Sequence, residues 1–170
     1  GGLVRARFRV VRESVHATLV AMRHRPFCCE LIDRHVLGCS EASLEQAKNR
    51  FFVQGDPGAV LVLEVRHESR AVIETTMRTL EDELRAAGLG YAFPVLWGDD
   101  CNRVWDLRRA GQGLMNNVVG DARPREIVED TAVAVEDLPD VLPEFDALMP
   151  HKHGISFVYH AQASPGGVAT

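Results

Sequence analysis

The chain has 170 residues, of which 46% are hydrophobic and 25% charged, a composition typical of one globular domain. Nineteen basic against 24 acidic side chains give a net charge of −5, which provides no basic field for phosphates and excludes a nucleic-acid partner. No apolar run reaches the roughly 18 residues of a membrane span, and the N-terminus lacks a signal pattern. We therefore expect no transmembrane segment and a cytoplasmic location.

The four cysteines are Cys28, Cys29, Cys39 and Cys101. Cys28 and Cys29 are adjacent in a strand-like run, where neighbouring side chains point to opposite faces. No CxxC or Cys/His spacing indicates zinc. We expect reduced, mostly structural thiols.

The first elements follow from hydrophobic periodicity. Apolar residues alternate with Arg5, Arg7 and Arg9 over residues 4–11, which predicts a strand with one buried face and one wet, basic face. Ser14 is positioned to cap a following helix. Pro26 ends that helix and precedes a compact apolar strand over residues 27–33.

Residues 38–58 are rich in turn residues and predict a connection with one short helix at about 44–52. A strongly apolar strand follows over residues 59–65, then an amphipathic helix over 69–86 that ends before Gly88. A further strand over residues 91–96 completes the order β-α-β-β-α-β. This order predicts an α+β fold, a ferredoxin-like split βαβ sandwich.

The sequence of the second half of the chain predicts a partial repetition of the βαβ pattern. It contains a helix over residues 99–115, a strand over 126–133, a helix over 136–149 that Pro143 should kink or shorten, and a last strand over 155–160. Turn residues dominate after that strand. We therefore predict one domain over residues 1–162 and a disordered tail over 163–170.

Several residue groups could support chemistry. Gly111-Gln112-Gly113 lies within a helix-like segment and lacks a third glycine, which favours a helix contact over a phosphate loop. Arg108 and Arg109 are either solvated arginines of an amphipathic helix or a site for an anion, since a guanidinium binds a carboxylate with two nitrogens.

Two further groups lie near the C-terminus. The adjacent acids Glu129 and Asp130 interrupt a strand-like run, so one of them should face a buried or concave surface unless the strand is a wet sheet edge. Histidines 151, 153 and 160 could bind a metal ion, although their spacing defines no third ligand and a polar structural role is the alternative.

Seven stretches in this order resemble the C-terminal, substrate-capping domain of the FAD-linked oxidase family, which includes D-lactate dehydrogenases, glycolate oxidase subunits and D-2-hydroxyglutarate dehydrogenases. The stretches cover residues 29–34, 60–65, 104–109, 128–133, 136–139, 152–154 and 159–161. The resemblance implies an elaborated ferredoxin-like domain that covers a flavin held by a separate domain of the same parent chain.

The resemblance also implies an activity and a set of site residues. Family members oxidise a D-2-hydroxy acid to the 2-oxo acid and pass a hydride to FAD. Arg108 matches the arginine that binds the substrate carboxylate, and His160 matches a catalytic histidine that in some members helps to bind a divalent metal. Glu129 and Asp130 match an acidic pair near the active site.

One departure concerns the residues after His160, where the glycine and second histidine of the family are replaced by another sequence. We expect this chain to be part of a longer enzyme and inactive alone, with peripheral membrane contact and oligomerisation of the parent left open. The alternatives are a free-standing ferredoxin-like binding or regulatory module without catalysis, and a structural subunit that contacts a separate flavoprotein.

Overall fold

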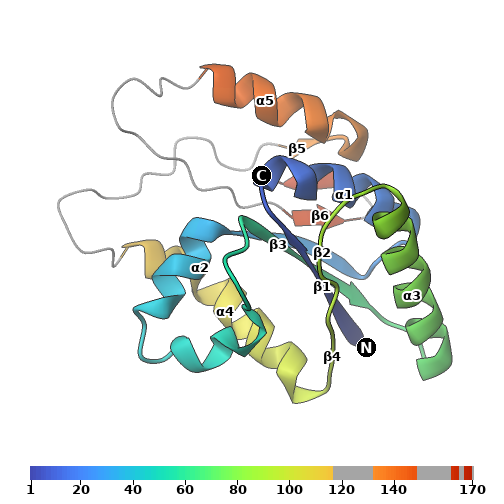
Figure 1. Ribbon diagram of the computed structural model, residues 1–170, viewed down its shortest axis with the longest axis horizontal. Coiled ribbons are helices and arrows are strands. Elements are labelled where there is room, and N and C mark those ends of the chain that lie inside the picture. The colour runs from blue at the N-terminus through green and yellow to red at the C-terminus, as the bar shows by residue number, and fades with distance from the viewer. Residues whose placement is uncertain (117–131, 149–161, 165–166, 170) are drawn as a thin grey trace.

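The protein is described by a computed structural model that covers residues 1–116, 132–148, 162–164 and 167–169. Its centre is an antiparallel sheet of β1 (Gly2–Phe8), β2 (Cys28–Asp33), β3 (Ala59–Val65) and β4 (Val95–Trp97). The strand order is β4-β1-β3-β2, with β1 and β3 paired along their whole length from Gly2↔Val65 to Phe8↔Ala59. The expected ferredoxin-like α+β core is confirmed (Figure 1).

One face of the sheet is covered by α1 (Val11–Arg23) and α3 (Arg70–Ala86). The predicted stripe of α3 is buried there, and it meets apolar side chains of all three long strands. The buried residues of the α3 stripe are Ile73, Met77, Leu80 and Leu84. Because alternate strand residues face this layer, the period-two pattern of β1 identifies its apolar side correctly.

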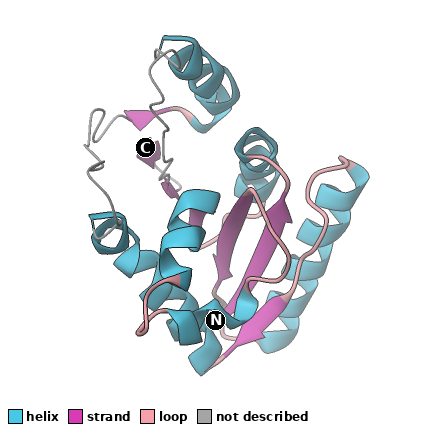
Figure 2. Ribbon diagram, turned by 60° about the vertical axis from the view of Figure 1, so that its left-hand side comes forward, coloured by secondary structure: helices cyan, strands magenta, loops and turns pink. Residues whose placement is uncertain are grey.

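The opposite face is covered as well, by α2 (Arg34–Glu41), the 3-10 helix η1 (Ala47–Phe52) and α4 (Asp99–Asn116), so the sheet lies between two helical layers (Figure 2). The expectation of a wet, basic face on β1 is therefore wrong. Arg5 and Arg7 are only 4% and 6% exposed. Periodicity shows that two faces differ in polarity, but it cannot show that a later helix covers the polar one.

Local signals explain several element ends. The Asp33 side chain caps α2 by accepting a hydrogen bond from the Val36 amide at 3.0 Å. Ser14 does not cap α1, because it lies inside the helix and donates to the Val11 carbonyl. Gly88 has a φ of 68° just after α3, as the C-terminal cap requires. At Gly58, where the chain enters β3, a Cβ would lie 2.0 Å from the Arg9 carbonyl oxygen.

The second half extends the sheet beyond β2. Short strands β5 (Ala132–Val133), β6 (Gln162–Ser164) and β7 (Gly167–Ala169) add antiparallel pairs in the order β2-β6-β7-β5. After the short 3-10 helix η2 (Val135–Asp137), α5 (Leu138–Leu148) continues through Pro143 and packs beside α1.

The expectations for this half can be compared with the described residues only in part. The strand expected over residues 126–133 is described only as β5, and the strand expected over 155–160 lies outside the described residues. β6 begins one residue before the segment expected to be a tail, and β7 lies within that segment. β6 pairs with β2, and β7 pairs with β6 and β5.

Replacing the buried Arg5 should stabilise the fold. Its Nε and Nη1 have no hydrogen-bond partner among the described residues, and burial together with the nearby Arg7 lowers the pKa of Arg5 to about 10. An unpaired buried charge costs more than an apolar side chain of similar length. We expect Arg5→Met to raise the free energy of unfolding by about 1 kcal/mol or more, measured by urea denaturation.

Arg7→Met serves as the matched control. Arg7 Nη2 donates to the Phe52 carbonyl at 3.0 Å, so its loss leaves a buried acceptor unpaired and should lower stability. If Arg5→Met destabilised the protein as much as Arg7→Met, the unpaired state of Arg5 would be contradicted.

The cap at Asp33 gives a prediction with a definite sign. Burial raises the pKa of the Asp33 carboxyl above its ordinary value of 3.8, so the folded state binds this proton more tightly than the unfolded chain. This contribution to stability therefore falls as pH rises from about 4.

Asp33→Asn retains the acceptor without the charge, and its stability at pH 7 should equal or exceed that of the wild type. Asp33→Ala should lose about 1 kcal/mol, and thermal melts at pH 4 and pH 7 test both.

Candidate functional site

Arg108 projects from α4 toward the sheet and meets Glu30 of β2. Its Nε lies 2.8 Å from Glu30 Oε2, and the two side chains are 11% and 16% exposed. The Nε–H is not aligned well enough with that oxygen to form a hydrogen bond, so the contact is an ion pair. Among the described residues, no hydrogen bond or ion pair engages the two terminal nitrogens of this guanidinium.

Strand alternation explains why Glu30 faces α4. Ile32 of β2 packs in the cluster beneath α2 and α4, whereas Cys29 and Leu31 belong to the cluster under α1 and α3. Glu30 has the parity of Ile32 and therefore faces α4. Burial lowers the pKa of Arg108, while the negative charge of Glu30 opposes this shift. The Glu30 carboxylate thus offsets part of the cost of burying the guanidinium charge.

Cys28 holds the second oxygen of the Glu30 carboxylate. Its thiol donates to Glu30 Oε1 at 3.3 Å. Burial, and next the charge of Glu30, raise the pKa of Cys28 to about 12, so at neutral pH this side chain is a protonated thiol that can donate. Each carboxylate oxygen of Glu30 therefore has its own partner.

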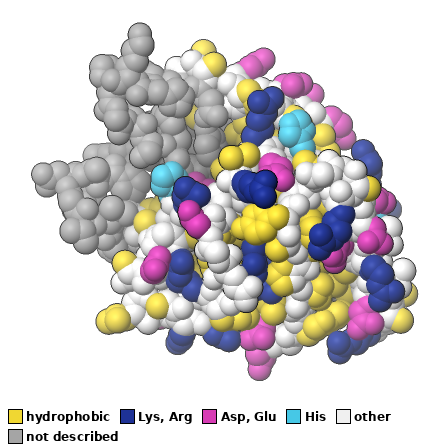
Figure 3. Space-filling view, in the orientation of Figure 1, with side chains coloured by type: hydrophobic (Ala, Val, Ile, Leu, Met, Phe, Trp, Pro, Cys, Tyr) yellow, Lys and Arg dark blue, Asp and Glu magenta, His cyan; other side chains and the backbone are white. Residues whose placement is uncertain are grey.

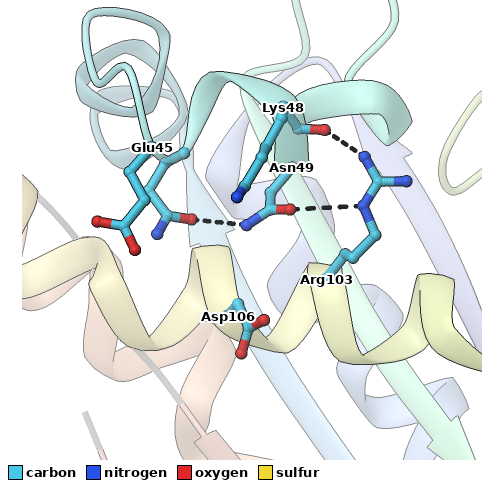
Figure 4. Close-up of a pocket in the computed structure, with 6 residues that line it drawn as sticks. Glu45, Lys48, Asn49, Arg103 and Asp106 are labelled. Carbon is cyan, nitrogen blue, oxygen red and sulfur yellow. Dashed lines mark hydrogen bonds between the residues drawn. The ribbon is translucent and has the colours of Figure 1, made fainter.

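α4 is anchored to the sheet next to Arg108. Val104 and Leu107 are fully buried against apolar residues of β1, β2 and β3, and Trp105 packs at the edge of the same cluster. One helical turn from Leu107, Arg103 reaches η1, where its Nε lies 3.4 Å from Asn49 Oδ1 and its Nη2 contacts the Lys48 carbonyl (Figure 4). These contacts restrain the helix that carries Arg108.

A depression of about 680 Å³ lies where Arg103 of α4 contacts η1. It is lined by Glu45, Gln46, Lys48, Asn49, Arg103 and Asp106. Its amides are already paired, since Asn49 Nδ2 donates to Gln46 Oε1 at 3.0 Å. Arg103 also forms an ion pair with Asp100 at 3.1 Å. Because Gln46, Asn49 and Arg103 are linked by hydrogen bonds and the charges of the lining have both signs, the depression is best explained as a structural junction of η1 and α4.

The structure describes only some of the residues predicted to form the site. Arg109 lies on a different side of α4, is 71% exposed and pairs with Asp106 at 2.5 Å, as expected for a solvated arginine. Glu129, Asp130 and His160 lie outside the described residues. Gly111-Gln112-Gly113 lies inside α4 and is no loop. Within the described ranges, no three His, Cys, Asp or Glu residues gather as metal ligands.

Glu30 is the functional candidate that sequence reasoning missed. It is the one charged residue in the apolar run from Phe27 to Ile32, and a charge inside such a strand is a signal of a buried partner. The partner itself could not be identified, because Arg108 lies 78 positions later in the chain.

The surface of the described residues carries both signs of charge. In Figure 3, Lys and Arg side chains lie beside Asp and Glu over most of this face, with apolar side chains between them. Exposed ion pairs of the described residues include Arg34 with Asp56 and Arg70 with Glu74. No helix in the described part of the chain is long and apolar enough to cross a membrane.

The family model described as "FAD linked oxidases, C-terminal domain" matches residues 3–170. This match includes the sheet, both helical layers and the Arg108–Glu30 pair. The chain belongs to this family of C-terminal domains, and the expected resemblance is confirmed.

The chain is similar to D-2-hydroxyglutarate dehydrogenase of Pseudomonas putida, with 27% identity over 155 residues, covering 86% of this chain and 15% of the relative. Proteins of the same name from Pantoea ananatis and Escherichia coli are 42% and 40% identical over 59 and 55 residues, covering 35% and 32% of this chain and 6% and 5% of those proteins. The chain thus spans at most about a seventh of the length of these relatives.

The cysteines should react slowly in the folded protein. All four are free, and burial raises the pKa of each. For Cys28, a pKa of about 12 in place of 9.0 lowers the thiolate fraction at pH 8 about a thousandfold. Alkylation by iodoacetamide, followed by peptide mass spectrometry, should therefore leave Cys28 unmodified under conditions that label a model thiol.

The unfolded chain provides the control for this measurement. In urea without reductant, all four cysteines should be labelled. Rapid labelling of Cys28 in the native protein would contradict its role as a protonated donor to Glu30.

Proposed function

We propose that this chain is the substrate-capping domain of a flavin-dependent oxidoreductase that converts a D-2-hydroxy acid, of the lactate, glycolate or 2-hydroxyglutarate class, to the 2-oxo acid. Its membership of the FAD-linked oxidase family supports the flavin-linked activity. The names of its relatives support a 2-hydroxy acid as the substrate. The activity belongs to a longer parent protein, in which this chain contacts a flavin-binding domain.

The observation that carries this proposal is the state of Arg108. Its Nε faces Glu30 at 2.8 Å, and its terminal nitrogens have no partner among the described residues. A guanidinium of low exposure, with two terminal nitrogens that are unpaired among the described residues, matches the planar carboxylate of a small organic acid, and low exposure strengthens such a contact. In the proposed complex, the substrate carboxylate binds to Nη1 and Nη2.

The described residues do not fit the pyrophosphate of FAD. Gly111-Gln112-Gly113, the motif that partly resembles a phosphate loop, lies within α4, where helical hydrogen bonds use the backbone amides. We therefore assign the flavin to another domain of the parent, where it accepts the hydride. This chain contributes the carboxylate site, with His160 as the proposed catalytic residue and metal ligand, and Glu129 and Asp130 as the proposed acidic pair nearby.

Arg108→Lys in the full-length parent tests this assignment. Lysine keeps the positive charge, but its single nitrogen cannot serve both Glu30 and a two-point contact with the substrate. A charge-assisted contact contributes roughly 1.5 to 3 kcal/mol, so kcat/KM for the 2-hydroxy acid should fall about ten- to a hundredfold. Flavin content should stay unchanged, because the cofactor belongs to the other domain.

Arg109→Lys is the matched control on the neighbouring position. Arg109 is mostly exposed and pairs only with Asp106 among the described residues, so its replacement should change kcat/KM less than twofold. Equal losses for both variants, or no loss for either, would contradict the carboxylate site. A non-catalytic ferredoxin-like binding module would show no loss for either variant.

A further inference from the structure

We propose that Glu30 is a positioning residue that orients the Arg108 guanidinium for the substrate carboxylate. This inference rests on the function proposed above and adds a residue to it. Glu30 itself does not meet the substrate in this proposal. It acts through Arg108, and the Cys28 thiol in turn holds Glu30.

The geometry of the three side chains supports this role. Glu30 Oε1 accepts from the Cys28 thiol at 3.3 Å, and Glu30 Oε2 lies 2.8 Å from Arg108 Nε. Two anchored oxygens restrict rotation of the carboxylate and therefore of the guanidinium beside it. Because Glu30 occupies the Nε edge, a ligand carboxylate is directed to the opposite edge, formed by Nη1 and Nη2.

The backbone around Glu30 makes this restraint rigid. Glu30 lies in the middle of β2, in register with Val62 of β3 on one side and with Gln162 of β6 on the other. A side chain on an interior strand position moves less than one on a loop. Arg108, by contrast, is long and flexible, and an unrestrained arginine loses considerable side-chain entropy when it binds a ligand.

A second role for Glu30 makes the opposite prediction. If Glu30 only neutralised Arg108, its removal would leave a bare cation and tighten the binding of an anionic substrate. If Glu30 positions Arg108, its removal frees the guanidinium and weakens substrate binding. The sign of the change in KM therefore distinguishes the two roles.

The test uses steady-state kinetics of the full-length parent with the D-2-hydroxy acid. We expect Glu30→Ala to raise KM about tenfold, comparable to the loss of one charge-assisted contact, with a smaller change in kcat. Glu30→Gln is nearly isosteric and keeps an oxygen that can face Nε. It should fold normally and recover part of the lost affinity. In the Arg108→Lys background, Glu30→Ala should cause little further change in KM.

Glu64→Gln is the matched control. Glu64 lies on the adjacent strand, directly opposite Cys28, and is similarly buried at 13% exposure, but it pairs with Arg66 instead of Arg108. Its replacement should leave KM unchanged. This control separates the specific effect on Arg108 from a general loss of charge on this face of the sheet.

Three results would overturn the proposal. A lower KM in both Glu30 variants would show neutralisation alone. An unchanged KM with reduced stability would show a purely structural role. A rise in KM for Glu64→Gln equal to that for Glu30→Ala would show a general effect of charge. If Arg108→Lys impairs turnover while the Glu30 variants do not change KM, only this inference fails. If Arg108→Lys has no effect, the proposed function fails with it.

Discussion

The pairing of β1 with β3 over seven residues determines what the rest of the molecule must do. Every residue of β1 and all but one of β3 are buried, so both faces of the sheet need a covering layer. α1 and α3 supply one layer, as in a simple split βαβ sandwich. The insertion of α2 and η1 between β2 and β3, together with α4 after β4, supplies the other (Figure 2).

The second layer encloses charges as well as apolar side chains. Arg5, Arg7, Glu30 and Arg108 all lie between the sheet and the helices or 3-10 turn above it. Arg7 donates a hydrogen bond to the Phe52 carbonyl, and Arg108 forms an ion pair with Glu30. The guanidinium carbon of Arg5 lies 5.5 Å from the centre of the Phe52 ring. Such groups contribute little to net stability, because desolvation offsets their attraction. A role in substrate binding is proposed for Arg108, and this role gives a reason for its burial. No such role is proposed for Arg5.

α4 connects the fold to the proposed chemistry. Its apolar side is buried by Val104 and Leu107, its Arg103 is clamped to η1, and its Arg108 reaches β2. An arginine on a helix that is restrained in this way can hold a narrow range of orientations. This arrangement is consistent with the proposed function, in which Arg108 presents its cation to a small acid.

Local sequence determined much of the fold. Branched apolar residues identified β3, a four-residue stripe and Gly88 identified α3, and the order of elements identified the ferredoxin-like core. Local pattern left Arg108 and Arg109 as either solvated arginines or an anion site, and only the resemblance to a known family selected Arg108 as a site residue. These features depend on neighbours within one or two helical turns, which a single segment contains.

Only the tertiary structure decided which polar residues are buried and with what partner. The alternating arginines of β1, Arg5 and Arg7, have the pattern of a solvated face, and they are enclosed because α4 and η1, 40 or more positions away, pack over them. Glu30 and Arg108 are separated by 78 positions, and their contact exists because α4 crosses the sheet above β2. Periodicity within a strand or helix reports the polarity of its faces, whereas burial depends on the distant segment that covers them.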